Sequence, residues 1–504
     1  MDALLANLRT YWLVHLMLVV YTALLAYHAW QGGRSTRGVT DYYVGGRRMG
    51  GVALGLSFFA TYSSTNSFVG FAGQSYTWGV AWLLLVPFIV GMAIFSWLVV
   101  APRLRRFTER LDSLTIPDFI GFRYDSRTAR VAAAVLVIFA SFFYMTAVFK
   151  GIGNLLEAFL EIPYRMAIVI VFFVVVIYTM VGGFISVVKT DVVQGVVMIV
   201  AAILLAWGTV SAAGGIRALD AVRADPATAH LFDWNGGVAF AVALGVIFSG
   251  TVKLAVEPRQ LSRFYALESQ SAARAGAWVS IASFGIVYAL LVPLGLYARR
   301  IIPDGITETD AVVPALLTTS GAFSSGTAAF LLLGMVAAAM SSLDSVLLVT
   351  ASTADRDIVR LLRPRPADEG AVVRSTRGYV ALFAAITAAI ALNPPGGIVS
   401  LTSFSGALYG ACFAPPILLG LYWRRGNGAS VLASFTVGIV VLLGWRLLPW
   451  SEVVHEVFPA LALSFLAFGA VAWFTRIPAS AALDRLFAPS GPAISAAAPV
   501  RSPA

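Results

Sequence analysis

Long apolar segments with few charged residues dominate this amino-acid sequence. A helix needs about 20 apolar residues to cross the hydrocarbon core of a bilayer. Only helices and closed barrels satisfy their backbone hydrogen bonds there, and continuous rather than alternating segments favour helices. We therefore predict an all-α membrane protein with about thirteen transmembrane helices. The predicted spans lie near residues 12–30, 49–76, 80–101, 128–160, 164–182, 188–213, 236–260, 274–298, 326–360, 375–393, 397–423, 429–447 and 456–475.

The positions of the basic residues indicate membrane orientation rather than a nucleic-acid partner. The 504 residues include 35 Lys and Arg against 25 Asp and Glu, a net charge of +10. Most of the basic residues lie in loops on one side of the predicted spans, such as RLRRFTER at 103–110 and RLLRPRP at 360–366. Cytoplasmic loops carry this excess. We expect a bacterial-type plasma-membrane protein in a lipid bilayer, with its N-terminus outside and its C-terminus in the cytoplasm.

The segments between the spans argue against an enzyme. The longest predicted inner loops, near 102–127 and 361–374, are too short for a soluble domain. No GxxxxGK[ST] phosphate loop is present, and the four histidines show no metal-ligand spacing. We therefore expect neither catalysis nor direct use of ATP.

One apolar segment contains a cluster of hydroxyl groups and an aspartate, AAMSSLDS at 338–345. On a helix, Ala338, Ser341, Ser342 and Ser345 share one face. Adjacent hydroxyls and helix carbonyls would suit a hard cation such as sodium. The alternative is that these serines bond to carbonyls of their own helix and ease packing.

Two of the predicted spans are interrupted by polar or helix-breaking residues. The second contains TYSSTNS at 61–67, and the seventh contains Gly250, Lys253 and Pro258. Breaks at corresponding places in two halves of a chain are typical of transporters built from inverted repeats. The second to sixth spans would form one repeat and the seventh to eleventh the other.

Five segments, in order, resemble the sodium:solute symporter family. They are DYYVGGRRMGG (41–51), YTMVGGFISVVKTDVVQG (178–195), EPRQLSRFYALESQSAARAG (257–276), AAMSSLDS (338–345) and PPILLGLYWRRGNGAS (415–430). The resemblance implies the leucine-transporter-like five-plus-five inverted repeat with extra flanking helices. We expect an N-terminal extra helix and inner loop at 1–48, repeats at 49–213 and 214–428, two extra helices at 429–475 and a disordered cytoplasmic tail at 476–504.

The same resemblance implies a sodium site. In the family, carbonyls of the first broken helix and a carbonyl and two hydroxyls of a later helix bind the ion. These correspond here to Ala60 and Ser63, and to Ala338, Ser341 and Ser342. One sodium per cycle is expected, because one such site is recognisable.

Two aspartates are candidates for the sodium path or for tuning the site. Asp191 matches a family position associated with the inner exit route, but it could also pair with Lys189 at the interface. Asp344 flanks the hydroxyl face and would either tune the ion or pair with Lys150 or Lys253.

The predicted substrate residues are the hydroxyls of Ser64, Thr65 and Ser67 together with Lys150 and Lys253. Lys150 and Lys253 are the two cationic residues that we expect to lie well inside the predicted spans. If they face the cavity, they favour an anionic solute. If they pair with Asp344 or Glu257 instead, their role is structural.

The function that we predict is sodium-coupled uptake of a small organic solute, a carboxylate first, by alternating access. The alternative is a proline-like amino acid or another neutral solute, although Gly250 and Leu254 replace the Trp and Tyr of the proline branch. An ion or solute channel is a more remote alternative, because no ring-forming filter motif is present. The segment 303–325 is expected to form an outer lid.

Overall fold

The structure is a computed structural model that describes residues 7, 9–302, 306, 308–318, 321–363, 368–476 and 481–487. Within these residues the chain is helical, and its one β-like feature is an isolated bridge between Met49 and Leu267. The helices are α2 (Trp12–Ser35), α3 (Val39–Val44), α4 (Gly51–Tyr62), α5 (Phe71–Trp78), α6 (Leu85–Phe95), α7 (Ala101–Leu111), α8 (Ile116–Tyr124), α9 (Arg127–Leu160), α10 (Tyr164–Ala212), α11 (Ala218–Ala224), α12 (Phe240–Val256), α13 (Pro258–Ala266), α14 (Gln270–Leu291), α15 (Leu294–Ala298), α16 (Val312–Thr318), α17 (Ser325–Thr353), α18 (Arg360–Leu362), α19 (Glu369–Ala391), α20 (Ile398–Ala414), α21 (Gly420–Tyr422), α22 (Gly428–Trp445), α23 (Val457–Phe474) and α24 (Ala481–Phe487).

Each of the thirteen predicted spans coincides with helix. Ten continuous helical stretches in the described part of the chain are long and apolar enough to cross a membrane. The two counts differ for three reasons. The second half of the broken span at 49–76 runs on into the next one, α10 contains two predicted spans, and α19 is not among the ten.

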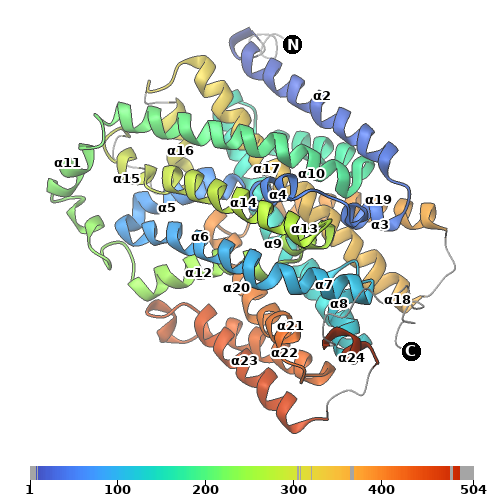
Figure 1. Ribbon diagram of the computed structural model, residues 1–504. Helices are drawn as coiled ribbons and strands as arrows, with labels where there is room; N and C mark the ends of the chain where they lie inside the picture. Colours follow the sequence, from blue (N-terminus) through green and yellow to red (C-terminus); the bar gives the residue numbers. More distant parts are fainter. Residues whose placement is uncertain are drawn as a thin grey trace.

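The long helices lie side by side, and the molecule has two ends (Figure 1). We call the end with α11, α15 and α16 the lid end, and the end with α7, α8 and α18 the basic end. In the view of Figure 1 they lie to the left and the right. We call the turn Thr309–Ala311 and α16 the lid, because they lie within the segment 303–325; its role as a lid stays a prediction.

Burial separates a core from flanking helices. In the helical stretch Ser325–Leu362, which contains α17, 89% of the most apolar 18-residue segment is buried. The corresponding share is 22% in α2 and 28% in α23. A helix that is apolar but exposed faces lipid, so α2 and α23 lie at the periphery and α17 at the centre. This agrees with the expectation that extra helices flank the core.

Both predicted interruptions are real breaks. Helix α4 ends at Tyr62, Ser63 is extended, and helical structure resumes near Asn66 and continues as α5. Helix α12 ends at Val256, Glu257 is extended, and Pro258 begins α13. Proline suits the first position of a helix because it has no backbone N–H to satisfy there. Each break frees carbonyl groups in the interior of the molecule.

The predicted spans at 164–182 and 188–213 form two helices that meet at Gly183 and together make up α10. This residue has φ 62° and ψ −170°, a conformation open to glycine. A side chain would also meet the ring of Tyr42, since an added Cβ would lie 2.6 Å from it. The two spans are therefore joined through a single residue.

A short helix lies within the predicted disordered tail. Residues Ala481–Phe487 form α24, and the ring of Phe487 packs edge-on against Phe107 of α7. Arg110 donates a hydrogen bond to the Leu486 carbonyl. The other tail residues beyond Arg476 lie outside the described part of the chain.

Candidate functional site

The serine face of α17 lies against the end of α4. The hydroxyl oxygen of Ser341 is 2.9 Å from the Ala60 carbonyl oxygen and 3.1 Å from that of Ala338. The hydroxyl oxygen of Ser342 is 3.0 Å from the Thr61 carbonyl and 3.1 Å from the Ser63 carbonyl. The structure thus brings together the five residues predicted as sodium ligands and adds Thr61. We call these six residues the oxygen cluster (Ala60, Thr61, Ser63, Ala338, Ser341 and Ser342).

The oxygen cluster has the donor set that a hard cation prefers. All six residues are fully buried, and the contacts are made by neutral carbonyl and hydroxyl oxygens. Here each serine hydroxyl donates to a carbonyl, but its lone pairs can bind a cation instead. Oxygens this close can exchange their mutual hydrogen bonds for a shared ion without large side-chain movement. Because Ser341 and Ser342 bond across to α4, their role exceeds bonding within their own helix.

Asp191 is part of a buried ion pair next to the oxygen cluster. Its Oδ2 accepts hydrogen bonds from Ser57 (2.6 Å), Thr61 (3.2 Å) and Arg263 (2.9 Å). Lys189, the alternative partner in the sequence, instead donates to Gln31 of α2. The pair with Arg263 joins α10 to α13. An exit-path role for Asp191 stays a prediction.

Asp344 is fully buried and pairs with neither of the lysines considered for it. Its Oδ1 accepts a 3.3 Å hydrogen bond from Ser345, and its Oδ2 has no hydrogen-bond partner among the described residues. Ser345 in turn accepts a hydrogen bond from Arg263 at 2.7 Å. Asp344 therefore joins the network around Arg263 through Ser345.

The predicted substrate hydroxyls lie at the first break. Ser67 is 2.6 Å from the Tyr288 hydroxyl, and Ser64 accepts from the backbone N–H of Asn66. The Thr65 hydroxyl is buried and has no partner among the described residues. Ser64 and Ser67 thus each have a partner here, and Thr65 has none among the described residues.

Lys253 is buried near the second break. Its Nζ donates to the Thr402 carbonyl at 3.3 Å and lies 4.9 Å from the ring centre of Tyr144 and 5.8 Å from that of Tyr62. An ammonium group has three donors, and the described residues offer one acceptor here. Tyr62 belongs to the end of α4, so Lys253 lies close to both breaks.

Two further charged residues at this break were not predicted as site residues. Arg259 forms an ion pair with Glu257 (2.7 Å), stacks 3.7 Å above the ring centre of Tyr144, and donates to the Thr61 carbonyl at 2.8 Å. The Glu257 Oε2 and Arg259 Nη2 atoms have no hydrogen-bond partner in the described part of the chain. With Lys253, the group carries two positive charges and one negative.

The sequence contained a signal for these arginines. Arg259 and Arg263 stand four residues apart after Pro258, on one face of a helix that begins at the proline. Each is 1% exposed, so Lys150 and Lys253 are not the only cations deep in the molecule. The predicted span ended at 260, which placed Arg263 in a loop.

Lys150 lies apart from Lys253, at the lid. Its Nζ is 2.8 Å from Asp310 Oδ2 and 3.3 Å from the Gly396 carbonyl. The same carboxylate oxygen accepts from the backbone N–H of Ile398 at 3.1 Å. Asp310 therefore holds the lid to α9 and to the start of α20, and we call these contacts the latch. Direct binding of substrate by Lys150 stays a prediction.

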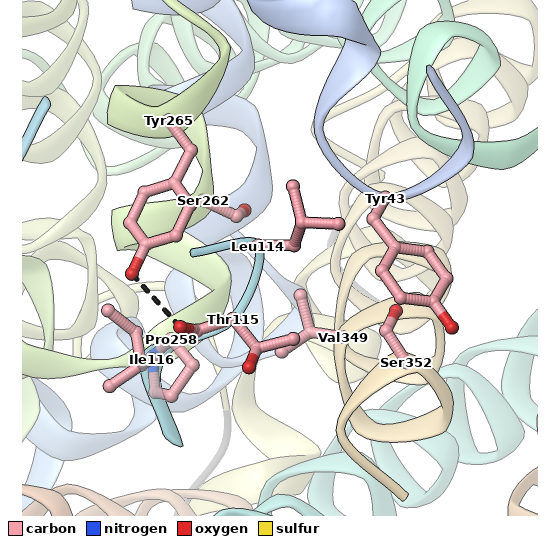
Figure 2. A pocket seen from close by; sticks show the side chains of 9 residues that line it. All are labelled: Tyr43, Leu114, Thr115, Ile116, Pro258, Ser262, Tyr265, Val349 and Ser352. Atoms are coloured by element: carbon pink, nitrogen blue, oxygen red, sulfur yellow. Dashed lines mark hydrogen bonds between the residues drawn. The ribbon is translucent and has the colours of Figure 1, made fainter. Parts of the chain in front are cut away.

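A narrow cavity lies on the basic-end side of the oxygen cluster. Figure 2 shows its lining, which includes Tyr43 of α3, Thr115, Tyr265 of α13, and Val349 and Ser352 of α17. Within this lining, Tyr265 donates to the Thr115 carbonyl at 3.2 Å. Its volume is about 20 Å³, enough for about one water molecule. Since Val349 follows Ser342 by seven residues, the cavity lies two helical turns from the cluster.

Comparison with known proteins identifies the family of the chain. The profile of the sodium:solute symporter family matches residues 42–438. An osmoregulated proline transporter of Bacillus subtilis is 31% identical over 483 residues, which cover 93% of this chain and 96% of the relative. A sodium/pantothenate symporter of Haemophilus influenzae is 29% identical over 469 residues, covering 90% and 94%.

Among solved structures, a substrate-bound, outward-open Na⁺-coupled sialic acid symporter matches with a TM-score of 0.79 at 18% identity, over 92% of this chain and 98% of that one. This likeness confirms the predicted leucine-transporter-like fold. Because the family profile covers most of the chain and the relatives align over nearly their full length, this chain is a member of the sodium:solute symporter family.

Proposed function

We propose that this integral membrane transporter couples sodium movement to the uptake of a small organic carboxylate bound between its two broken helices. Sodium-coupled solute transport follows from the family. That the solute carries a carboxylate goes beyond the family. This part of the proposal rests chiefly on the surplus positive charge at the second break. Lys253 and Arg259 face one acidic residue, Glu257, in a buried setting.

The charge balance argues for an anion. A buried charge is costly unless it is paired, and Arg259 is already paired with Glu257. Among the described residues, Lys253 has no carboxylate within ion-pair distance and makes one hydrogen bond. A solute carboxylate beside Lys253 would supply the missing acceptors and neutralise the excess charge. The unpartnered hydroxyl of Thr65 offers a second contact from the first break.

Sodium would act through the oxygen cluster. An ion shared by the cluster would join α4 to α17 more firmly than the present hydrogen bonds, because interactions with a charged group are stronger than those between neutral groups. The ion would thus favour the conformation in which the first break is ordered against α17. A ligand shifts such an equilibrium by its difference in affinity for the two states.

Each end of the molecule would then open in turn. At the lid end, the latch of Lys150, Asp310 and Ile398 must part before solute can enter. At the basic end, Tyr265 and Thr115, joined by a hydrogen bond, line the narrow cavity that an ion leaving the cluster would meet. Opening of one end while the other stays closed is the alternating access expected of this fold.

The orientation that we propose places the lid end outside and the basic end in the cytoplasm. It rests on the concentration of arginines around α7, α8 and α18. A cysteine at Asp112, an exposed residue of the basic end, would test it with Cys412 replaced. Labelling of intact cells by an impermeant maleimide would overturn this orientation, and labelling after permeabilisation alone would support it.

A zwitterionic amino acid is the second candidate. A relative 31% identical is named a proline transporter, and the free Oε2 of Glu257 could accept an ammonium group. The two candidates share the carboxylate and differ in the need for a positive charge on the solute.

Uptake into proteoliposomes under a sodium gradient separates these possibilities. Labelled pantothenate, L-proline and glucose would represent an anion, a zwitterion and a neutral solute. We expect sodium-driven accumulation of the anion, and its loss in Lys253→Met but not in Lys189→Met, a matched change at a lysine that bonds to Gln31. Accumulation of glucose alone, or equal effects of the two changes, would overturn the carboxylate proposal.

A further inference from the structure

An apolar pocket of about 280 Å³ lies between the core and the flanking helix α23. Its walls come from α6, α12, the end of α20 with the turn that follows it, and α23. The residues that line it are all apolar, and they include Gly91, Phe95, Val252, Leu418 and Phe465. Cavities with such walls stay dry, and one of about 150 Å³ takes up benzene. The pocket therefore suits a hydrocarbon group rather than a polar solute.

The pocket opens on a surface that faces lipid. Gly91 is exposed, and an added Cβ there would meet no atom within 4 Å. Nearby on the same walls, Leu98 is 63% exposed and Leu466 of α23 is 65% exposed. Apolar side chains that are exposed on membrane-spanning helices contact lipid chains, so hydrocarbon is the solvent at the mouth of the pocket.

A hydrogen bond joins two walls of the pocket on the side of the basic end. Tyr422 donates to the Val99 carbonyl at 2.6 Å. Val99 follows Phe95 of the pocket by four residues, and Tyr422 follows Leu418 by four. Both residues therefore lie about one helical turn beyond the pocket, and the two walls continue side by side toward the basic end.

Arg103 lies next along the same walls. Its guanidinium group is 4.0 Å above the ring centre of Tyr422, and its Nη1 donates to the Leu421 carbonyl at 2.8 Å. In the described part of the chain, Arg103 has no carboxylate within ion-pair distance. Its positive charge is therefore available to an anionic group from outside the protein.

The spacing between Arg103 and the pocket matches the length of a lipid chain. Gly91 precedes Arg103 by twelve residues in one continuous helical stretch, which corresponds to about 18 Å along a helix. The chains of one leaflet cover half of a hydrocarbon core that is about 30 Å thick. A phosphate beside Arg103 would thus place the end of its acyl chain at the pocket.

We propose that a phospholipid of the leaflet on the basic-end side binds here, with its phosphate at Arg103 and one acyl chain in the pocket. Basic residues near a membrane surface attract anionic lipid headgroups. The ring of Tyr422 lies between the two sites, at the level where amphipathic aromatic side chains gather. A bilayer phospholipid combines the anionic group and the long chain that this arrangement fits.

The bound chain would touch the helix that leads to the second break. Val252 and Ala255, which line the pocket, belong to the last two turns of α12 before Glu257. Ser96 also donates to the Leu254 carbonyl at 2.5 Å, which ties the end of α6 to the same part of α12. The lipid therefore packs against a helix of the transport core, whichever solute binds at the break.

A photoreactive phospholipid tests the site. The probe is phosphatidylglycerol with a diazirine near the end of one acyl chain, in vesicles of phosphatidylethanolamine and phosphatidylglycerol that contain the full-length protein. After irradiation, mass spectrometry should find stronger labelling of peptides from α12 than of α2, which is largely exposed to lipid. Labelling of α12 no stronger than that of α2 would overturn the site.

Filling the pocket from within the protein should displace the chain. Gly91→Phe should lower labelling of α12 about tenfold, as expected when about two methylene contacts are lost. Gly469→Phe is the matched control, because Gly469 of α23 lies outside the lining and an added Cβ there also meets no atom within 4 Å. Gly91→Leu serves if Gly91→Phe does not fold. Equal labelling of α12 in the Gly91 and Gly469 variants would overturn the pocket as the chain site.

Removing the charge tests the headgroup contact. Arg103→Gln should lower labelling by the phospholipid about two- to fivefold, as expected for one partly exposed charge, and leave labelling by an uncharged diacylglycerol with the same chain unchanged. Arg425→Gln is the control, since Arg425 also stacks over an aromatic ring, that of Trp473, and donates to a backbone carbonyl. Equal effects of the two changes, or diacylglycerol labelling as strong as that by the phospholipid, would overturn the phosphate contact. These measurements need neither sodium nor solute, so their outcome is separate from that of the proposed function.

Discussion

The two broken helices differ in chemistry although they occupy corresponding places in the two repeats. The first break, at Ser63 after α4, collects neutral oxygens from α4 and α17. The second, at Glu257 after α12, collects fixed charges from Lys253, Glu257 and Arg259. A break in a helix is thus surrounded by neutral oxygen atoms in one case and by ionised side chains in the other.

This difference indicates a division of labour, in which the first break binds the ion and the second binds the solute. Neutral oxygens can hold a cation and release it without leaving a fixed charge behind in the membrane interior. Fixed positive charges need a counter-charge, which the solute can bring and take away. The following changes test each side of this division, from the largest expected effect to the smallest.

Replacing both serines of the oxygen cluster should have the largest effect. Ser341→Ala with Ser342→Ala removes two ligands, each worth about 1.5–3 kcal/mol to a charged group, so the sodium concentration for half-maximal uptake should rise more than about 100-fold. Uptake measured against sodium concentration would show this. Ser283→Ala, at a serine that bonds to Val279 of its own helix, is the control. If the double variant keeps its sodium dependence, the cluster is not the ion site.

Disrupting the ion pair between Asp191 and Arg263, next to the first break, should chiefly lower the stability of the protein. Asp191→Asn leaves the buried Arg263 charge without its counter-charge, which costs about 3–5 kcal/mol. Thermal unfolding of the purified protein would measure the loss. Adding Arg263→Met should recover part of the stability, because no unpaired charge then remains. A double variant less stable than Asp191→Asn would contradict this account of the pair.

Removing the charge at the second break should act on the solute rather than on the ion. Lys253→Met deletes one charge-assisted contact, worth about 1.5–3 kcal/mol, so KM for a carboxylate should rise about 10- to 150-fold. The sodium dependence should stay as in the wild-type protein. A matching shift in sodium affinity would show that the two breaks do not divide the labour.

Opening the latch should have the smallest effect. Lys150→Met removes one partly buried partner of Asp310, and we expect KM to change about two- to fivefold, equally for charged and neutral solutes. Uptake of paired carboxylate and amide compounds would measure this. A larger change in KM for the carboxylate than for the amide would support the sequence-based prediction that Lys150 binds substrate.

Periodicity and hydropathy predicted what is local in this molecule. The serine face at 341, 342 and 345 follows from helical spacing alone, and the breaks follow from TYSSTNS and Pro258. The resemblance to the family then connected ATYSS at 60–64 to AAMSSLDS at 338–345, nearly 280 residues apart. Such a contact between distant segments has no signal in spacing.

What the sequence could not provide was the direction of charged side chains around their helices. Lys150 and Lys253 looked equivalent, because both stand in apolar segments, yet one pairs with the lid and the other lies beside Tyr62 and Tyr144. Similarly, the partner of Asp191 was sought nearby at Lys189, whereas it came from α13, 72 residues away. Tertiary packing decides these pairings.

The turn at Gly183 has a consequence for how the protein is made. Two spans meet there through one residue, and the first charge that follows is Lys189. Without a polar connector to rest in the aqueous phase between two insertion events, these spans would enter the bilayer together as one unit. An epitope inserted at 183 should therefore stop biogenesis of the transporter at this turn, whereas one inserted in the exposed segment near 225 should be tolerated.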